Sequence, residues 1–283
     1  MHDYMLGLYE KALPPTLTWR ERLAAAGETG FDYLEISIDE TDARLMRLDW
    51  SLDERLDLLR AMSETGVRVE SMCLSALRRF PLGDPDPAVR ERGLGVLGAA
   101  LELARDLGLR IIQIPGYDVY YQESTEQTRE LFAETLPAAI EMASRAGVPL
   151  GFETMEPLFM DQVSKAMRYV RMVNSPYLGV YPDLGNVSNG SLISGVPVEQ
   201  DVATGAGHIF AAHFKETVPG EYRDRMLGDG TTDYDGALAA LLPQGVRRFV
   251  CEIWYHGGDA WRDDLVATSR FAREKIEAAF ARL

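Results

Sequence analysis

The sequence predicts a parallel (β/α)₈ barrel, on the basis of three observations. Apolar strand-like runs alternate with helix-like segments along the whole chain of 283 residues, as in repeated strand–helix units. Three of these runs end in Glu153, Asp183 and His213, which are spaced 30 residues apart, the length of one strand–helix–strand unit. A later run ends in Glu252. Because the strands of a parallel barrel all end at one mouth, we expect these four side chains to meet there.

Eight apolar runs are expected to form the strands. The first four are expected at residues 4–9, 31–38, 67–74 and 109–114, and the last four end at the four residues named above. Glycine immediately precedes several strands, at Gly66, Gly108, Gly147 and Gly245. A short helix-to-strand turn favours glycine, because the residue that ends a helix often adopts a left-handed backbone conformation.

Capping signals mark the starts of helices. Capping boxes are expected at Thr18 and Glu21, at Ser51 and Glu54, and at Ser124 and Gln127. Pro87 is expected near the start of the helix that runs to Gly108, because proline fits the first helical turn. No linker or break in composition divides the chain, so residues 1–283 are expected to form one barrel domain.

Composition limits the possible partners. The net charge of −15 and the pI of about 4.8 disfavour nucleic acid and anionic membranes as partners. The two cysteines, Cys73 and Cys251, lie in apolar runs and are expected to be buried without a disulfide, which is typical of a reducing cytoplasm. No run approaches the ~20 apolar residues of a membrane span. We therefore expect a cytoplasmic protein that binds neither nucleic acid nor a membrane.

Two Glu, one Asp and one His together predict a metal site at the mouth of the barrel. Such a set offers mostly hard oxygen ligands to one divalent ion per chain, and it suits Zn²⁺, Mn²⁺, Co²⁺ or Mg²⁺. A single carboxylate at a strand end is more often a helix cap or an ion-pair partner. The prediction therefore depends on the four residues occurring together at equivalent positions.

Several short motifs resemble the L-ribulose-5-phosphate 3-epimerase family, and the resemblance covers nearly the whole chain. They are EKALP (10–14), DETD (39–42), RLDW (47–50), SMCLSA (71–76), RRFPLG (78–83) and GYDVYYQE (116–123). The resemblance implies a xylose-isomerase-like TIM barrel, zinc as the favoured ion, a ketose phosphate as substrate, and a homodimer or higher homo-oligomer. It also implies that the family's metal ligands fall on Glu153, Asp183, His213 and Glu252.

The reaction implied by this resemblance interconverts L-ribulose 5-phosphate and L-xylulose 5-phosphate. The proton on C3 is removed and one is returned on the other face, through an enediolate whose charge the divalent ion stabilises. Two carboxylates on opposite sides of the sugar can act in turn as base and acid. We expect Glu153 and Glu252 to have these roles in addition to metal ligation, with Asp183 and His213 as ligands only.

Substrate contacts are expected from residues that follow the strands. They are Glu10, Lys11, Arg78, Arg79, Tyr117, Asn186, Lys215 and Trp254. Paired arginines can bind a phosphate, although acidic proteins also place arginine in surface ion pairs. Asn186 can equally form a local turn, Tyr117 can simply pack, and Trp254 can cap the barrel. One departure from the family concerns the substrate: Leu77 stands where the family usually has a histidine.

Other functions are also compatible with a metal-binding barrel. The nearest alternative is 3-epimerisation of an unphosphorylated ketose, followed by isomerisation between C1 and C2. A non-catalytic sugar-binding barrel would follow if Leu77 marked lost activity, yet both expected bases are present. A DNA-repair endonuclease would need a basic groove and a richer metal cluster than four histidines in the whole chain allow.

Overall fold

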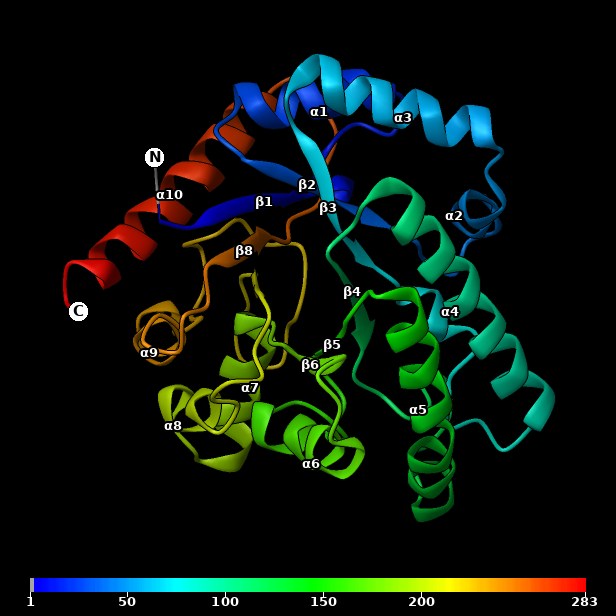
Figure 1. The fold of residues 1–283 in the computed structure, drawn as a ribbon. Coiled ribbons are helices and arrows are strands. Elements are labelled where there is room, and N and C mark those ends of the chain that lie inside the picture. The colour runs from blue at the N-terminus through cyan, green and yellow to red at the C-terminus, as the bar shows by residue number, and fades with distance from the viewer. Residues whose placement is uncertain (1–2) are drawn as a thin grey trace.

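The computed structural model describes residues 3–283 and, within them, shows eight parallel strands surrounded by helices (Figure 1). The strands are β1 (Met5–Tyr9), β2 (Tyr33–Ser37), β3 (Arg68–Cys73), β4 (Ile111–Pro115), β5 (Leu150–Glu153), β6 (Leu178–Tyr181), β7 (Ala212–Phe214) and β8 (Arg248–Cys251). The α-helices are α1 (Trp19–Glu28), α2 (Asp42–Leu45), α3 (Leu52–Thr65), α4 (Pro87–Leu107), α5 (Glu126–Ala146), α6 (Val163–Val173), α7 (Leu184–Ser194), α8 (Val198–Ala203), α9 (Tyr234–Leu241) and α10 (Trp261–Phe280). Short 3₁₀ helices are also present: η1 (Glu10–Ala12) follows β1, η2 (Met46–Asp49) follows α2, and η3 (Ser75–Arg78) follows β3.

The strands follow one another around the barrel in the order β6-β5-β4-β3-β2-β1-β8-β7. The ring is completed between β6 and β7 by isolated bridges, which pair Val180 with Ile209 and Asp183 with His213. We call this junction the β6–β7 seam. Two of the predicted metal ligands therefore lie opposite each other across the seam.

The predicted barrel is confirmed, and three of the four strands that were expected to end at a ligand residue end elsewhere. β6 ends at Tyr181 rather than at Asp183, because Pro182 has no backbone N–H with which to continue the ladder. β7 contains only three residues, so His213 lies at its centre rather than at its end. β8 ends at Cys251, so Glu252 lies one residue beyond it. All three differences leave the side chains at the same mouth of the barrel.

The helix starts agree with the sequence in all but one case. The capping boxes at Thr18 and at Ser51 are confirmed, and Pro87 is the first residue of α4. The box predicted at Ser124 and Gln127 is wrong, because Thr125 caps α5 through the Thr128 amide. The Ser124 hydroxyl has other partners, since it donates to Asp118 Oδ2 at 2.9 Å and accepts from Arg129 Nε at 3.0 Å.

Two apolar layers hold the barrel together. Aliphatic side chains from the helices pack on the outer faces of the strands, and tyrosines fill part of the interior. The hydroxyl of Tyr33 donates to the Phe249 carbonyl at 3.1 Å, and that of Tyr181 donates to Glu35 at 3.0 Å. A buried tyrosine needs such a partner for its hydroxyl. Cys73 and Cys251 are buried and free, as predicted.

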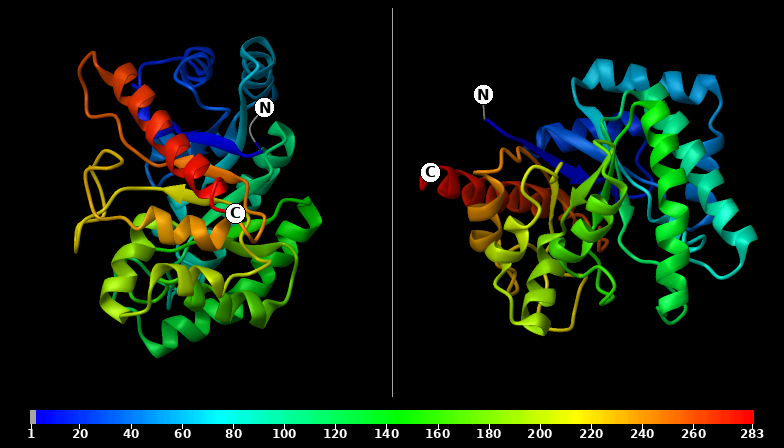
Figure 2. Two further views of the ribbon diagram at one scale, coloured as in Figure 1. Left: turned by 90° about the vertical axis from the view of Figure 1, so that its left-hand side faces the viewer. Right: turned by 60° about the horizontal axis from the view of Figure 1, so that its bottom comes forward.

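The last helix closes the molecule beside the first strand. α10 contacts β8, and its C-terminal end lies beside Tyr4, just before β1 (Figures 1 and 2). The Tyr4 ring stacks on Phe280 with the ring centroids 5.9 Å apart. Among the helices of residues 3–283, none combines the length and the apolar character that a membrane span requires.

Candidate active site and metal centre

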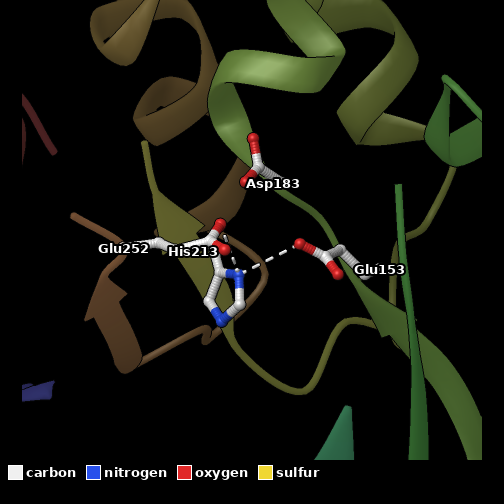
Figure 3. Close-up of side chains that lie close together, drawn as sticks. All are labelled: Glu153, Asp183, His213 and Glu252. Carbon is white, nitrogen blue, oxygen red and sulfur yellow. Dashed lines mark hydrogen bonds and ion pairs between the residues drawn. The ribbon is translucent and has the colours of Figure 1, made fainter. Parts of the chain in front are cut away.

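The four predicted ligands converge at the mouth of the barrel (Figure 3). Glu153 is the last residue of β5, Glu252 follows β8, His213 lies in β7 and Asp183 caps α7. Each offers one ligand atom, and these four atoms lie within 4.8 Å of one another. All four side chains are buried. The strand spacing in the sequence therefore predicted a true spatial cluster.

The side chains are aimed at a common point. Nδ1 of His213 lies 3.3 Å from Glu153 Oε1 and 3.3 Å from Glu252 Oε2 (Figure 3). Asp183 uses Oδ1 to accept the Asn186 amide at 2.7 Å, which caps α7. Its other oxygen faces the cluster, where Lys215 Nζ lies 2.8 Å away.

The charges of the cluster fit a divalent cation. Glu153, Asp183 and Glu252 bring three carboxylates, and Lys215 brings the ammonium that lies among them. Three carboxyl groups therefore share one lysine in a buried site, which is costly without a further partner. A set of three carboxylates and one imidazole is also a suitable ligand set for such an ion. The four predicted residues can thus hold one metal ion.

The crowding of these groups shifts their ionisation. Burial raises the pKa of Glu153, and the Glu252 carboxylate raises it further. Burial raises the pKa of Asp183 to about 8, because Lys215 offsets only part of the effect. Burial also opposes ionisation of Glu252, but Lys215 and His213 overcome it and hold the pKa of Glu252 well below its usual range. The carboxyls of the cluster are thus strongly interdependent.

Two buried polar residues support the cluster and were missed by the sequence analysis. Gln113 on β4 donates from Nε2 to Glu153 Oε2 at 2.6 Å, which leaves Oε1 facing His213. Glu35 on β2 lies 2.7 Å from His213 Nε2. The signal was present, since each interrupts an otherwise apolar strand, YLEIS and IIQIP. A polar residue in such a strand needs a buried partner.

A cavity opens above the cluster, and several predicted substrate contacts line it. Its walls include Lys11, Arg78, Glu153, Lys215, Glu252 and Trp254. Tyr222 and Arg223, which the sequence analysis did not select, also line it. Both come from the segment between β7 and α9, whose length was the only signal in the sequence. The cavity thus joins the metal ligands to basic side chains from three separate loops.

The two arginines of the RRF motif point in different directions. Arg78 lines the cavity, and its guanidinium lies over the Tyr120 ring, 4.3 Å from the centroid. Arg79 does not line the cavity; it is half exposed and pairs with Asp42 at 2.8 Å. Arg79 therefore forms a surface ion pair, which is the alternative to phosphate binding that the sequence left open. Leu77 is buried in the hydrophobic core and is not among the residues that line the cavity.

Glu10 does not reach the cavity, contrary to the expectation from its position after β1. It is completely buried, and its carboxylate pairs with Arg22, Arg44 and Arg47. It also accepts the Ser37 amide at 2.8 Å. Both oxygens are therefore occupied by the chain itself. Glu10 joins the loops after β1 and β2 rather than contacting a ligand.

Tyr117 and Asn186 lie behind the cavity wall. Tyr117 is buried against Tyr120, with ring centroids 5.1 Å apart. Asn186 is buried, and its Nδ2 donates to the Thr154 carbonyl at 2.7 Å. The packing role that the sequence left open accounts for Tyr117. The Asn186 side chain forms neither a wall of the cavity nor a local turn, because its contact with Thr154 spans 32 residues.

Comparisons with known proteins agree with this architecture. The family model described as xylose isomerase-like TIM barrel matches residues 23–275. The chain is 47% identical over 250 residues to L-ribulose-5-phosphate 3-epimerase UlaE of Salmonella paratyphi C (strain RKS4594), covering 88% of this chain and 87% of the relative. It is 44% identical over 278 residues to the protein of that name from Escherichia coli (strain SMS-3-5 / SECEC), covering 98% and 95%.

Solved structures extend the likeness at the level of the fold. An L-ribulose 3-epimerase matches with a TM-score of 0.77 at 20% identity, covering 99% of this chain and 96% of the other. A D-tagatose 3-epimerase-like protein matches with a TM-score of 0.79 at 16% identity, covering 98% and 99%. The sequence relationship to the curated enzymes is much stronger than these. The chain therefore belongs to the L-ribulose-5-phosphate 3-epimerase family of xylose isomerase-like TIM barrels, a family of isomerases.

Proposed function

We propose that this chain is a metal-dependent 3-epimerase that interconverts L-ribulose 5-phosphate and L-xylulose 5-phosphate. The observation that supports this most directly is the placement of Glu153 and Glu252. They come from β5 and β8, both line the cavity, and both approach the same ring nitrogen of His213 at 3.3 Å. An epimerisation needs two such groups, because one face of the sugar loses a proton and the other gains one.

Glu153, Asp183, His213 and Glu252 would hold the ion, with Zn²⁺ as the first choice and Mn²⁺, Co²⁺ or Mg²⁺ as alternatives. When bound, a divalent ion would supply Lewis acidity that stabilises the negative charge developing on the ketose. The protein residues do the proton transfers. In one direction one glutamate removes the C3 proton while the other returns a proton to the opposite face, and in the reverse direction they exchange roles.

Neighbouring residues keep these two carboxylates in place. Gln113 holds one oxygen of Glu153, so that the other is directed at the cluster. Lys215 Nζ lies 2.8 Å from Asp183 and 3.8 Å from Glu252, and it also lines the cavity. It can therefore donate a hydrogen bond to a substrate oxygen. Its ammonium favours negative charge on the oxygens around it.

Arg78 is our candidate for the phosphate of the substrate. Its nearest carboxylate partner, Glu40, is 3.9 Å away, and its Nε is buried without a hydrogen-bond partner. Arg223 lines the same cavity and is 3.8 Å from Glu156. Neither guanidinium is committed to a close ion pair, so both can turn to an anion. Lys11 and Trp254 complete the wall as proposed substrate contacts.

The proposed reaction can be tested by proton exchange in D₂O. Enzyme of known metal content is incubated with L-ribulose 5-phosphate, and the deuterium position is read by NMR. We expect label at C3, whereas label at C1 would indicate an isomerase. The same assay with L-ribulose separates the phosphorylated substrate from the free ketose. A higher kcat/KM for the free sugar would transfer the proposal to that second substrate class.

Two isosteric variants test the two-base assignment. Glu153→Gln and Glu252→Gln should each lower turnover in both directions by at least about 100-fold, the lower range for a general base. Metal content must be measured in each, because both residues are also proposed ligands. Glu70→Gln is a matched control, since Glu70 is another buried barrel glutamate but pairs with Arg248 away from the cavity. Wild-type turnover in either test variant would refute the assignment.

The remaining expectations concern the whole protein. We propose one barrel domain over residues 1–283, a homodimer or higher homo-oligomer, and a cytoplasmic location. A single unfolding transition and the mass in solution by light scattering test the first two. Fluorescent tagging in cells tests the third.

A further inference from the structure

His213 makes contacts with both of its ring nitrogens, and the two contacts differ in kind. Nδ1 faces the proposed metal position, 3.3 Å from both Glu153 and Glu252. Nε2 points to the interior of the barrel, where Glu35 Oε1 lies 2.7 Å away. Glu35 is on β2, 178 residues earlier in the chain, and its side chain is fully buried.

The Glu35 carboxylate is held in one orientation by its other oxygen. Oε2 accepts a hydrogen bond from the Ser71 hydroxyl at 2.7 Å and another from the Tyr181 hydroxyl at 3.0 Å. Ser71 is also the register partner of Glu35 across β2 and β3. Oε1 is thus left for His213 alone. Within residues 3–283, the one ion pair of Glu35 is this contact with His213.

We propose that Glu35 is a positioning residue that orients His213 for metal binding. The inference rests on the metal site proposed above. The carboxylate can only accept, so the contact at 2.7 Å keeps a proton on Nε2. A neutral imidazole carries one proton, and the lone pair is therefore presented on Nδ1, toward the three carboxylate ligands. Such a partner fixes both the ring orientation and the ligating nitrogen of a metal-binding histidine.

Replacing Glu35 by glutamine should reverse the direction of the hydrogen bond at His213 Nε2. In Glu35→Gln, the side-chain oxygen should remain where two hydroxyls donate to it, beside Ser71 and Tyr181. The amide NH₂ would then face Nε2 of His213 and donate to it. That bond favours the proton on Nδ1, the nitrogen that the ion needs. A change of one atom would therefore oppose metal binding rather than merely weaken a contact.

Titration calorimetry with Zn²⁺ on the metal-free protein tests the proposal directly. We expect Glu35→Gln to raise the Kd for Zn²⁺ by about 10- to 100-fold relative to wild type, the usual effect of losing such a partner. The control is Glu70→Gln, which also removes a buried glutamate charge from a neighbouring strand but should leave the Kd unchanged. Thermal unfolding of the metal-free variants measures any loss of stability separately.

Nitrogen NMR of ¹⁵N-histidine protein supplies a readout that needs no variant. In zinc-loaded wild type, His213 should carry its proton on Nε2 and show a metal-shifted Nδ1. Zinc on Nε2 would overturn the proposal, and so would an unchanged Kd in Glu35→Gln. If wild type itself fails to bind Zn²⁺, Mn²⁺, Co²⁺ and Mg²⁺, the proposed metal centre is wrong and this inference falls with it. The two failures are therefore distinguishable.

Discussion

At the scale of single residues, charges near the mouth of the barrel have two different uses. Glu10 and Arg78 both follow strands, and the sequence treats them alike. In the structure Glu10 is enclosed by three arginines, whereas Arg78 keeps its guanidinium at the cavity wall. The difference is one of desolvation, because a fully buried carboxylate must have its partners within the protein. Each use leads to a testable prediction.

Removing the charge of Glu10 should destabilise the fold. Burial would raise the pKa of Glu10, but Arg47, Arg44 and the Ser37 amide outweigh it and lower the pKa. Glu10→Gln should reduce the free energy of unfolding at pH 7 by about 3–5 kcal/mol, because three guanidinium groups lose a buried partner. Urea unfolding measures this loss of stability. The control Glu64→Gln breaks the half-exposed pair with Arg20 and should cost at most about 1 kcal/mol.

The lowered pKa of Glu10 also predicts how the free energy of unfolding depends on pH. The pKa of Glu10 is lower in the folded than in the unfolded protein. The ionised carboxylate therefore stabilises the fold fully above its unfolded pKa of roughly 4.3. This contribution to stability is lost as the pH falls through the pKa of Glu10 in the folded protein. The stability difference between wild type and Glu10→Gln should therefore shrink below about pH 4. Unfolding curves at several acidic pH values measure this. A constant difference from pH 7 to pH 3 would contradict it.

Arg78 and Arg79 form a natural pair of test and control. Arg78→Ala should lower kcat/KM for L-ribulose 5-phosphate by roughly 10- to 100-fold, as expected for loss of a charge-assisted hydrogen bond. It should change kcat/KM for free L-ribulose much less. Arg79→Ala should leave both within about twofold, because Arg79 pairs with Asp42 outside the cavity and such exposed pairs contribute little. Equal losses in the two variants would exclude Arg78 as the specific phosphate contact.

At the scale of elements, close backbone contacts hold the strand ends in place. Gly116 directly follows β4 and lies against the end of β5. A Cβ at Gly116 would come within 2.3 Å of the Glu153 carbonyl oxygen and 2.7 Å of Met160 Sδ. Only glycine permits this approach. The position of Glu153 therefore depends on a residue that never touches the cavity.

Gly116→Ala should displace the end of β5 and disturb the metal site. We expect a loss of about 1–3 kcal/mol in unfolding free energy, as for other forced insertions into a packed site, together with weaker Zn²⁺ binding. Gly95→Ala is the control, because Gly95 lies in α4 and a Cβ added there would meet no neighbouring atom within 4 Å. It should instead raise stability by up to about 1 kcal/mol. Unchanged zinc affinity in Gly116→Ala would show that β5 adjusts without moving Glu153.

At the scale of the whole molecule, the junction of the barrel that is formed by isolated bridges coincides with the proposed metal site. The β6–β7 seam has isolated bridges, and its backbone hydrogen bonds include Phe210 N to Val180 O at 3.0 Å and His213 N to Pro182 O at 2.9 Å. Asp183 and His213 lie on its two sides. An ion held by both would join β6 to β7 by side chains as well as by backbone.

Metal binding should therefore stabilise the molecule and protect the seam in particular. At a free ion concentration of 100 times the Kd, linkage adds about 2.7 kcal/mol to the free energy of unfolding. Thermal unfolding with and without chelator measures this. Hydrogen exchange should slow most at the amides of Val180, Phe210 and His213. His213→Ala should abolish both effects, and uniform protection of all strands would argue against a local role at the seam.

Much of this protein is determined by sequence patterns that act over short distances. Strand and helix periodicity, the caps at Thr18 and Ser51, and the glycines that end helices depend on neighbours within a few residues. The convergence of Glu153, Asp183, His213 and Glu252 could also be predicted, because each follows an apolar strand and the strands of a parallel barrel all end at one mouth. The motifs of the family then indicated the class of reaction.

The tertiary structure alone decided which polar residues serve the site. Adjacent residues such as Arg78 and Arg79 diverge on a 3₁₀ turn, and only their surroundings separate a cavity wall from a surface ion pair. Glu35 meets His213 across 178 residues of chain. Such contacts depend on closure of the barrel and on which side chain fills its interior, so no local pattern encodes them. The cost of burying a polar atom selects its partner only after the fold has formed.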